Sequence, residues 1–316
     1  MSEPRLPPLT ALRAFEAAAR HMSFSLAADE LNVTPAALSF QIKSLEDHMG
    51  APVFRRLNRA VELTEAGKIL APGCARGFTE LTRAWAAALR SLDTSSLTIT
   101  AGPAFTAKWL APRLFDFAQK NPDIDLRFSA SLRLMDFERD GVDIAIRFGM
   151  GGDDKGLYSR VLIHEWLSPM VAPELAERLE TPADLAGVTL LDDDNLHFVS
   201  PPADWPAWFR AAGVVDPPSI IPRFSQADHA IDAAEAGAGA VLGRISLTAG
   251  ALRDGRLVMP FPIAITTKAH YRVLCPAGFE EKPQVKAFLD WLSGAVSGTG
   301  SAPDEVRFVS AEDVAP

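Results

Sequence analysis

The chain has 316 residues, of which 48% are hydrophobic and 22% are charged, the balance of a folded globular protein. This length is too great for one ordinary core and predicts two domains. The opening MSEPRLPPLT lacks an apolar run, and no stretch approaches the roughly 18 apolar residues of a span, so we expect neither export nor membrane insertion. The two cysteines, Cys74 and Cys275, favour free thiols in a reducing compartment, which predicts the cytoplasm.

The net charge of −9 argues at first against nucleic acid, but the charge is unevenly distributed. Residues 1–90 carry 11 basic and 9 acidic side chains, whereas residues 91–316 carry 20 basic and 31 acidic ones. Local placement, rather than the total, decides whether phosphates are bound. The N-terminal part therefore stays compatible with DNA binding, and the acidity belongs to the C-terminal part.

The N-terminal residues predict a helix-turn-helix. Residues 9–22 place apolar side chains at three- and four-residue steps, which predicts one helix with a single apolar face. Ser23 predicts the N-cap of a second helix over residues 24–31. After a turn, Thr34 caps a third helix and Pro35 occupies its first position, where the missing N–H is harmless.

The third helix is predicted to end near His48 and to have two unlike faces. Its buried stripe is Leu38, Ile42, Leu45 and Met49. Its opposite face carries Ala36, Ser39, Phe40 and Lys43. A recognition helix presses such a face against base edges in the major groove, with its N-terminal turn nearest to them.

Residues 53–63 predict a β-wing after the third helix. Two short strands flank the tip Arg55-Arg56-Leu57-Asn58-Arg59, and three arginines at a loop tip reach phosphates or the minor groove. The alternative is an ordinary solvated charged loop. The preceding helix-turn-helix favours the wing.

These motifs resemble those of the LysR-type transcriptional regulators. The matching stretches are TPAALSFQIKSLE (34–46) and VFRRLNRAVELTEAG (53–67), and the opening LPPLTALRAFEAAARHMSF is similar to the subgroup typified by the glycine-cleavage-system activator. The resemblance implies a non-enzymatic regulator that binds double-stranded promoter DNA, with RNA polymerase as a further partner. The candidate DNA-binding residues are Thr34, Pro35, Ala36, Ser39, Phe40, Gln41, Lys43, Arg55, Arg56, Asn58 and Arg59.

Two of these positions depart from the family pattern. Gln is frequent where Pro35 stands, and a polar residue is frequent where Phe40 stands. An exposed Phe covers a thymine methyl but cannot hydrogen-bond a base, and the alternative is a Phe folded back onto the core. The departures affect the preferred DNA sequence rather than DNA binding itself.

A long helix is predicted from Thr64 as cap to about Leu92. Its apolar side chains recur at alternating steps of three and four, the spacing of a coiled-coil seam, at Leu70, Cys74, Phe78, Leu81, Trp85, Ala88 and Leu92. The stripe predicts pairing with the same helix of a second chain, with packing inside one chain as the alternative. Pro72-Gly73 should kink or loosen the helix. The resemblance implies a homodimer or homotetramer.

Beyond the helix, strand-like and helix-like stretches alternate, which predicts parallel-rich sheets covered by helices. The pattern is that of two α/β subdomains, one interrupting the other, as in periplasmic substrate-binding proteins. We therefore expect an α/β fold with an N-terminal winged helix-turn-helix, a long linker helix and a two-subdomain effector domain. The predicted boundaries are 1–64 for the DNA-binding domain, 65–95 for linker helix and hinge, 96–297 for the effector domain and 298–316 for a flexible tail.

Ligands of open α/β sheets bind beyond the carboxyl ends of the strands, where helix N-termini attract anions. Hydroxyls, free N–H groups and one cation at such places predict a small carboxylate effector, such as an amino acid or organic acid. The candidate effector-binding residues are Ala104, Phe105, Thr106, Ser129, Ser131, Arg147, Ser225 and Gln226. Each polar one has an alternative role as a cap or turn former, and Arg147 has that of a salt bridge. His197 is a further candidate for shaping the cleft, and core packing is expected for Trp205 and Trp208.

The sequence contains no GxSxG, HExxH, CxxC or Walker motif, so we expect no enzyme and no cofactor beyond the effector. The run Asp192-Asp193-Asp194 is more typical of a solvated loop than of a metal site. A solute-binding receptor or transport protein without a DNA role is the alternative function. The 90-residue N-terminal unit argues against it.

Overall fold

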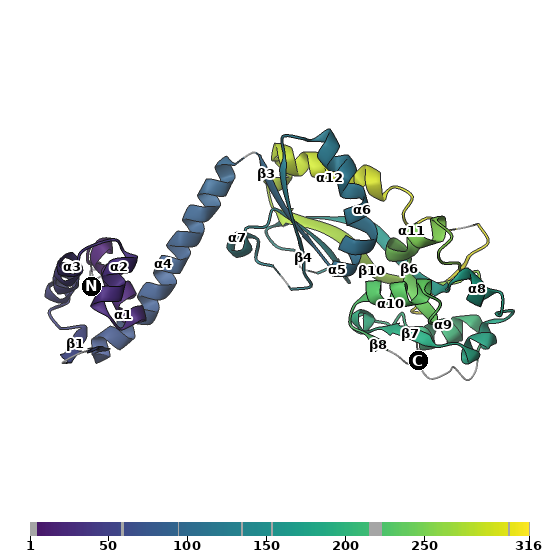
Figure 1. Cartoon of the computed structure of the whole chain (residues 1–316), viewed down its shortest axis with the longest axis horizontal. Helices are drawn as coiled ribbons and strands as arrows, with labels where there is room; N and C mark the ends of the chain where they lie inside the picture. Colours follow the sequence, from purple (N-terminus) through teal and green to yellow (C-terminus); the bar gives the residue numbers. More distant parts are fainter. Residues whose placement is uncertain are drawn as a thin grey trace. The chain divides into compact units, whose positions relative to one another are not determined.

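The computed structural model describes residues 5–57, 60–93, 95–133, 135–152, 154–214, 223–302 and 304–315. The chain forms two compact units, Met1–Leu92 and Asp93–Pro316. The first is helical with a small wing, and the second is an α/β unit built on one mixed sheet (Figure 1). The predicted fold class is confirmed.

The first unit contains the predicted three helices and wing. Its elements are α1 (Leu9–His21), α2 (Phe24–Glu30), α3 (Pro35–Met49), β1 (Phe54–Leu57), β2 (Ala60–Leu63) and α4 (Glu65–Leu92). The hydroxyl of Ser23 accepts from the Leu26 N–H at 3.4 Å, and the hydroxyl of Thr34 accepts from the Ala37 N–H at 3.2 Å. These caps satisfy N–H groups that a helix start leaves free, so the sequence fixes where α2 and α3 begin.

The core of the first unit lies between α1, α2, α3 and the wing base. Phe54 packs against Phe15 and Phe24, with ring centroids 5.5 and 5.2 Å apart. Leu38, together with Ile42 and Leu45, is buried as the helix pattern predicts. Met49 is 40% exposed, so its assignment to the buried stripe is wrong, because the helix ends there and Gly50 turns the chain away with a φ of 75°.

Helix α4 continues unbroken through Pro72. Leu70, Cys74 and Phe78 pack against the core of the first unit, so the N-terminal half of the stripe is covered within the chain. The C-terminal half remains exposed, with Leu81 at 55%, Trp85 at 67% and Leu92 at 78%. The single predicted seam is therefore two surfaces, one half-buried against the core of the first unit and one exposed.

The second unit contains a nine-stranded sheet in the order β4-β3-β5-β10-β6-β9-β7-β8, with β11 paired to β10. The strands are β3 (Ser96–Ala101), β4 (Asp125–Ala130), β5 (Ile144–Gly149), β6 (Leu157–Met170), β7 (Leu190–Asp193), β8 (Arg223–Phe224), β9 (Ala240–Arg244), β10 (Ile263–Pro276) and β11 (Arg307–Ser310). β3, β4 and β5 are parallel, and so are β7, β8 and β9. The long antiparallel strands β6 and β10 join these two groups, which are the two predicted subdomains.

Helices cover both groups of strands. They are α5 (Pro103–Phe105), a π-helical turn (Thr106–Leu110), α6 (Ala111–Lys120), α7 (Phe137–Asp140), α8 (Pro173–Ala176), α9 (Trp205–Ala212), α10 (Ala227–Glu235), α11 (Ile245–Arg253) and α12 (Pro283–Val296), with short 3-10 turns at Pro182–Gly187, Asp194–Leu196 and Phe279–Glu281. α12 packs against β3 and β6, whereas α10 packs against β7 and β9. The alternation read from the sequence therefore produces two covered parallel groups.

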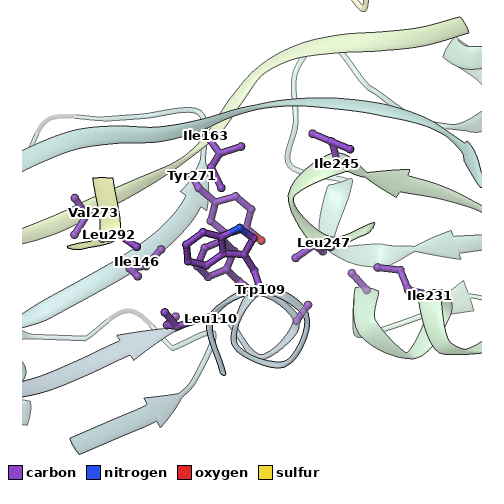
Figure 2. Close-up of a cluster of buried hydrophobic side chains, with 14 of the residues drawn as sticks. Trp109, Leu110, Ile146, Ile163, Ile231, Ile245, Leu247, Tyr271, Val273 and Leu292 are labelled. Atoms are coloured by element: carbon purple, nitrogen blue, oxygen red, sulfur yellow. The ribbon is translucent and has the colours of Figure 1, made fainter. Parts of the chain in front are cut away.

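One hydrophobic core extends across both subdomains. Figure 2 shows Trp109 and Tyr271 near its centre, with Ile231 and Leu247 of the second subdomain nearby. Phe105 stacks on Trp109 at 5.0 Å and on Tyr271 at 4.4 Å between ring centroids. A second core surrounds Trp205 and Trp208, which are fully buried as expected.

The C-terminal segment is part of the sheet. Arg307–Ser310 form β11, which runs parallel to β10 with Ile263 opposite Arg307. Val306 and Ala311 are buried, and Phe308 packs edge-on against Trp166 at 5.8 Å. The expectation of a mobile tail is wrong for this segment, because its few apolar residues find a free edge of β10.

Candidate DNA-binding surface and effector cleft

The outer face of α3 is open to solvent. Pro35, Ala36 and Lys43 are exposed, Ser39 and Gln41 are half-buried, and Phe40 is 70% exposed. The alternative in which Phe40 folds back onto the core is therefore wrong in this structure. The face combines a hydroxyl, an amide, an ammonium and an apolar ring on one capped helix, a set suited to base edges and thymine methyls.

The wing is held rigidly against α3 by a residue that sequence reasoning overlooked. The Glu46 carboxylate accepts from the backbone N–H groups of Val53, at 2.9 Å, and Phe54, at 3.3 Å. On the other side, a Cβ added to Gly67 would lie 2.3 Å from the Val53 carbonyl oxygen, so only glycine permits this close approach of α4. Recognition helix, wing base and linker helix therefore form one rigid piece.

Arg55 is the wing arginine whose side chain the structure describes. It is exposed and stands opposite Glu62 in the β1–β2 pair. Arg56 lies in β1, but its side chain is not among those described, and Asn58 and Arg59 lie outside the described residues. Arg55 therefore offers one exposed cation on the wing.

A cavity of about 590 Å³ lies at the carboxyl ends of β3 and β5, between the two subdomains. Five of the eight predicted effector residues line it, namely Ala104, Phe105, Ser131, Arg147 and Gln226. His197, the further candidate, lines it as well. The cavity therefore lies where the carboxyl ends of the predicted strands placed a ligand cleft.

Arg147 supplies a cation to the first wall of the cleft. Its guanidinium donates to the Thr100 hydroxyl at 3.2 Å and to the Ile146 carbonyl at 3.0 Å. Burial lowers the pKa of this guanidinium. Within the described part of the chain no carboxylate forms an ion pair with it, so the salt-bridge alternative is not realised there.

The cleft contains two further arginines that the sequence did not single out, Arg244 from β9 and Arg272, which stands opposite Arg147 in the β5–β10 pair. Arg244 lies over the Phe148 ring at 4.6 Å, and its guanidinium is 3.4 Å from the Tyr271 hydroxyl. Arg272 donates to Asp154 at the same cleft. These arginines stand in β9 and β10, whose strand patterns predict burial but give no sign of which side chains turn toward a cavity.

Asp194 and Asn195 form the acidic and amide side of the cleft. The Asn195 amide donates to the Asp193 carboxylate at 3.1 Å and to the Ser225 carbonyl at 2.7 Å, which fixes the loop. The His197 ring lies 3.6 Å from Asp192 and 3.7 Å from Asp194. Arg147 and Arg272 stand on β5 and β10, whereas Asp194 and Arg244 come from the second subdomain, so the cleft offers both charges to a ligand.

Three predicted effector residues lie off the cavity lining. The Thr106 hydroxyl donates to the Gly102 carbonyl at 2.8 Å, so it closes its own helical turn. Ser129 is exposed on β4, the edge strand. Ser225 is exposed, and its carbonyl rather than its hydroxyl is the bonded group. Thr106 has the turn-forming role stated as its alternative, whereas Ser129 lies within a strand and the Ser225 carbonyl accepts from Asn195.

Two family models match the chain. The bacterial regulatory helix-turn-helix domain of the lysR family matches residues 9–68, and the LysR substrate binding domain matches residues 90–297. The AmpR transcriptional activator of Rhodobacter capsulatus is 37% identical over 294 residues, covering 93% of this chain and 99% of that protein. The glycine cleavage system transcriptional activator of Escherichia coli K12 is 38% identical over 296 residues, covering 91% and 93%.

The second unit is also similar to solved effector domains of AmpR regulators. The effector domain of Pseudomonas aeruginosa AmpR superposes with a TM-score of 0.53 at 32% identity, covering 65% of this chain and 96% of that one. The Citrobacter freundii AmpR effector domain gives a TM-score of 0.54 at 28% identity, covering 64% and 98%. No described helix is long and apolar enough to cross a membrane.

Proposed function

The chain belongs to the LysR family of DNA-binding transcriptional regulators, and we propose that a small carboxylate in the cleft between its two subdomains controls its action at a promoter. The observation that carries the proposal is Arg147, a half-buried cation lining a cavity and held by neutral partners. An uncompensated guanidinium in a cleft stabilises an anion strongly, because charge-assisted hydrogen bonds strengthen as water is excluded.

The charges of the cleft narrow the ligand class further. A carboxylate placed at Arg147 leaves Asp194 and Asn195 on the other side of the cavity for a positively charged group. An amino acid satisfies both, whereas the second carboxylate of a dicarboxylate would face Asp194, since Arg244 on that side is already paired with Asp193. We therefore rank amino acids above organic acids among the candidate effectors.

The mechanism we propose is closure of the cleft. The long strands β6 and β10 join the subdomains, so a ligand that touches both walls favours the arrangement in which the walls are closer. A ligand changes this equilibrium only by binding the two arrangements with unequal affinity. Closure would then alter how subunits pack and how the recognition helices meet two half-sites of DNA.

Pairing of two chains through α4 is part of this proposal. Leu81, Trp85, Leu89 and Leu92 are each at least half exposed along its C-terminal half, an apolar surface that a second copy would cover. The pairing would give a homodimer, and dimers of dimers would give a homotetramer. A regulator of promoter DNA works beside RNA polymerase in the bacterial cytoplasm, which is where we place this one.

A thermal-shift screen of amino acids and organic acids on the full-length chain tests the proposal. A ligand at a hundredfold excess over its Kd stabilises by about 2.7 kcal/mol, which raises Tm by a few degrees. The same ligand should change promoter binding. Arg147→Gln should weaken binding of the ligand about tenfold or more, since the variant removes a charge-assisted hydrogen bond. Arg127→Gln, which changes an exposed arginine away from the cleft, should leave ligand binding unchanged. A ligand that shifts Tm without changing DNA binding would favour a solute receptor instead.

A further inference from the structure

The effector unit contains a second cavity, of about 610 Å³, that shares no lining residue with the cleft. It lies between α6 of the first subdomain, α11 of the second and the chain that follows α12, with strand β6 behind it. Its lining residues therefore come from both subdomains.

The inner wall of this cavity is apolar and fixed in place. Trp166 is 5% exposed, and its indole N–H donates to the Gly300 carbonyl at 2.9 Å. Ile245 and Leu257 are buried beside it, and Leu252 is half-buried. Such a wall binds a hydrocarbon group without first having to become ordered.

Two arginines form the polar rim. The Arg113 guanidinium lies over the Trp109 ring at 4.6 Å and donates to the Trp109 carbonyl at 2.7 Å. Burial, with repulsion from Arg253, lowers the pKa of Arg113. Arg253 is exposed and lies 3.4 Å from Asp254. Among the described residues no carboxylate lines the cavity and none forms an ion pair with Arg113.

The segment after α12 supplies the remaining wall. The Trp109 indole donates to the buried Thr299 hydroxyl at 3.1 Å, which fixes this segment against the π-helical turn. Ser297 and Ser301 line the cavity as exposed hydroxyls. The cavity thus combines an apolar floor, two adjacent cations and hydroxyl groups.

We propose that this second cavity binds an apolar monocarboxylate, with its carboxylate between Arg113 and Arg253 and its hydrocarbon chain against Trp166 and Leu252. Two guanidiniums that repel one another are stabilised by one shared anion, and the apolar floor removes the hydrocarbon chain from water. Because α6 and α11 belong to different subdomains, a ligand in this cavity, like one in the cleft, affects how the two subdomains are arranged. The site is a second input to the regulator, independent of the amino acid or organic acid proposed for the cleft.

Calorimetric titration of the full-length chain with sodium octanoate tests this site, with octanamide as the neutral control. Octanoate should bind at one site and octanamide at least about tenfold more weakly, since the amide lacks the charge. Leu252→Trp fills the cavity and should abolish binding. Arg253→Gln should weaken it about tenfold, and because Arg253 is exposed this variant keeps the test valid if Leu252→Trp misfolds.

Two further variants separate this site from the cleft. Arg127→Gln, an exposed arginine on β4, should leave octanoate binding unchanged. Arg147→Gln should also leave it unchanged, although it impairs the cleft. Absence of octanoate binding at millimolar concentration, equal binding of octanamide, or loss of binding in Arg147→Gln but not in Arg253→Gln would each overturn the proposal.

Discussion

Arg244, at the end of β9, and Asp193, at the end of β7, form a buried ion pair, with Nη2 and Oδ2 separated by 3.2 Å and side chains only 5% and 6% exposed. The Tyr271 hydroxyl lies 3.4 Å from the same guanidinium, and Arg244 also lines the cleft. The pair therefore connects β7 and β9 of the second subdomain with β10, one of the two strands that join the subdomains, at the edge of the cleft.

Breaking this pair should destabilise the effector unit. Asp193→Asn leaves the Arg244 charge buried without its partner, which costs about 3–5 kcal/mol in comparable buried pairs. Urea unfolding of the full-length chain, followed by tryptophan fluorescence, measures the loss. The matched control is Asp125→Asn, which removes an exposed partner of Arg127 and should cost less than about 1 kcal/mol. If both variants lower the free energy of unfolding equally, burial of the Arg244–Asp193 pair does not increase its contribution to stability.

Glu165 predicts a pH dependence of stability. Burial raises its pKa from 4.5 to about 7, with Arg244 partly opposing the shift. The folded chain therefore holds this proton more tightly than the unfolded chain. The stabilisation that this bound proton gives the folded chain is fully present below about pH 4.5. The free energy of unfolding then falls as the pH rises to about 7, by up to roughly 3 kcal/mol.

Glu165→Gln cannot ionise, so its stability should fall less between pH 5 and about pH 7 than that of the wild type. Melting curves of wild type and variant between pH 5 and about pH 8 give the comparison. The exposed Glu174→Gln is the control, and its curve should follow that of the wild type. Parallel curves for Glu165→Gln and wild type would contradict a raised pKa.

Arg55 should act on DNA through phosphate. Arg55→Ala should weaken binding to duplexes of any sequence, and the slope of log K against log salt should become shallower by about 1. Fluorescence anisotropy with a mixed-sequence duplex at several salt concentrations measures this slope. Lys120→Ala removes an exposed cation from α6 and should change neither quantity. An unchanged slope for Arg55→Ala would remove this arginine from the DNA surface.

Phe40 should act on DNA sequence preference instead. Its ring is 70% exposed on the outer face of α3, where we expect it to cover a thymine methyl, because it can make no hydrogen bond to a base. Phe40→Gln should change which base is selected at one position of each half-site while largely preserving affinity for phosphate. Selection from a random duplex pool, with wild type and variant in parallel, shows the change. Identical selected sequences would mean that the ring makes no base contact.

Trp85 should contribute to pairing of two chains. Trp85→Glu places a charge in the exposed apolar surface of α4 and should weaken self-association about tenfold or more, measured by analytical ultracentrifugation. Arg76→Glu is the matched control, because it lies about two and a half turns earlier, on the opposite side of the helix. If both variants associate like the wild type, α4 is not the interface.

The first unit was predicted from the sequence almost completely, because its signals are local. A cap at Thr34, a proline at the next residue and a three-and-four spacing of apolar residues act within a few turns of chain, and each has the role expected of it. The end of a stripe is less well determined. Met49 follows the pattern but lies at the last turn, where packing rather than spacing decides burial.

The alternation of elements predicted two α/β subdomains, and the rule that ligands bind beyond the carboxyl ends of strands predicted the place of the cleft. The order of the strands in the sheet came only from the structure. The sequence alone thus determined the fold class, the capped recognition helix and Arg147 as a cleft residue. Only tertiary structure brought Arg244 and Asp193 together across 51 residues of chain and gave β11 its place beside β10. Those outcomes depend on which long-range surfaces meet, and the free energy of such contacts is not encoded in the spacing of neighbouring residues.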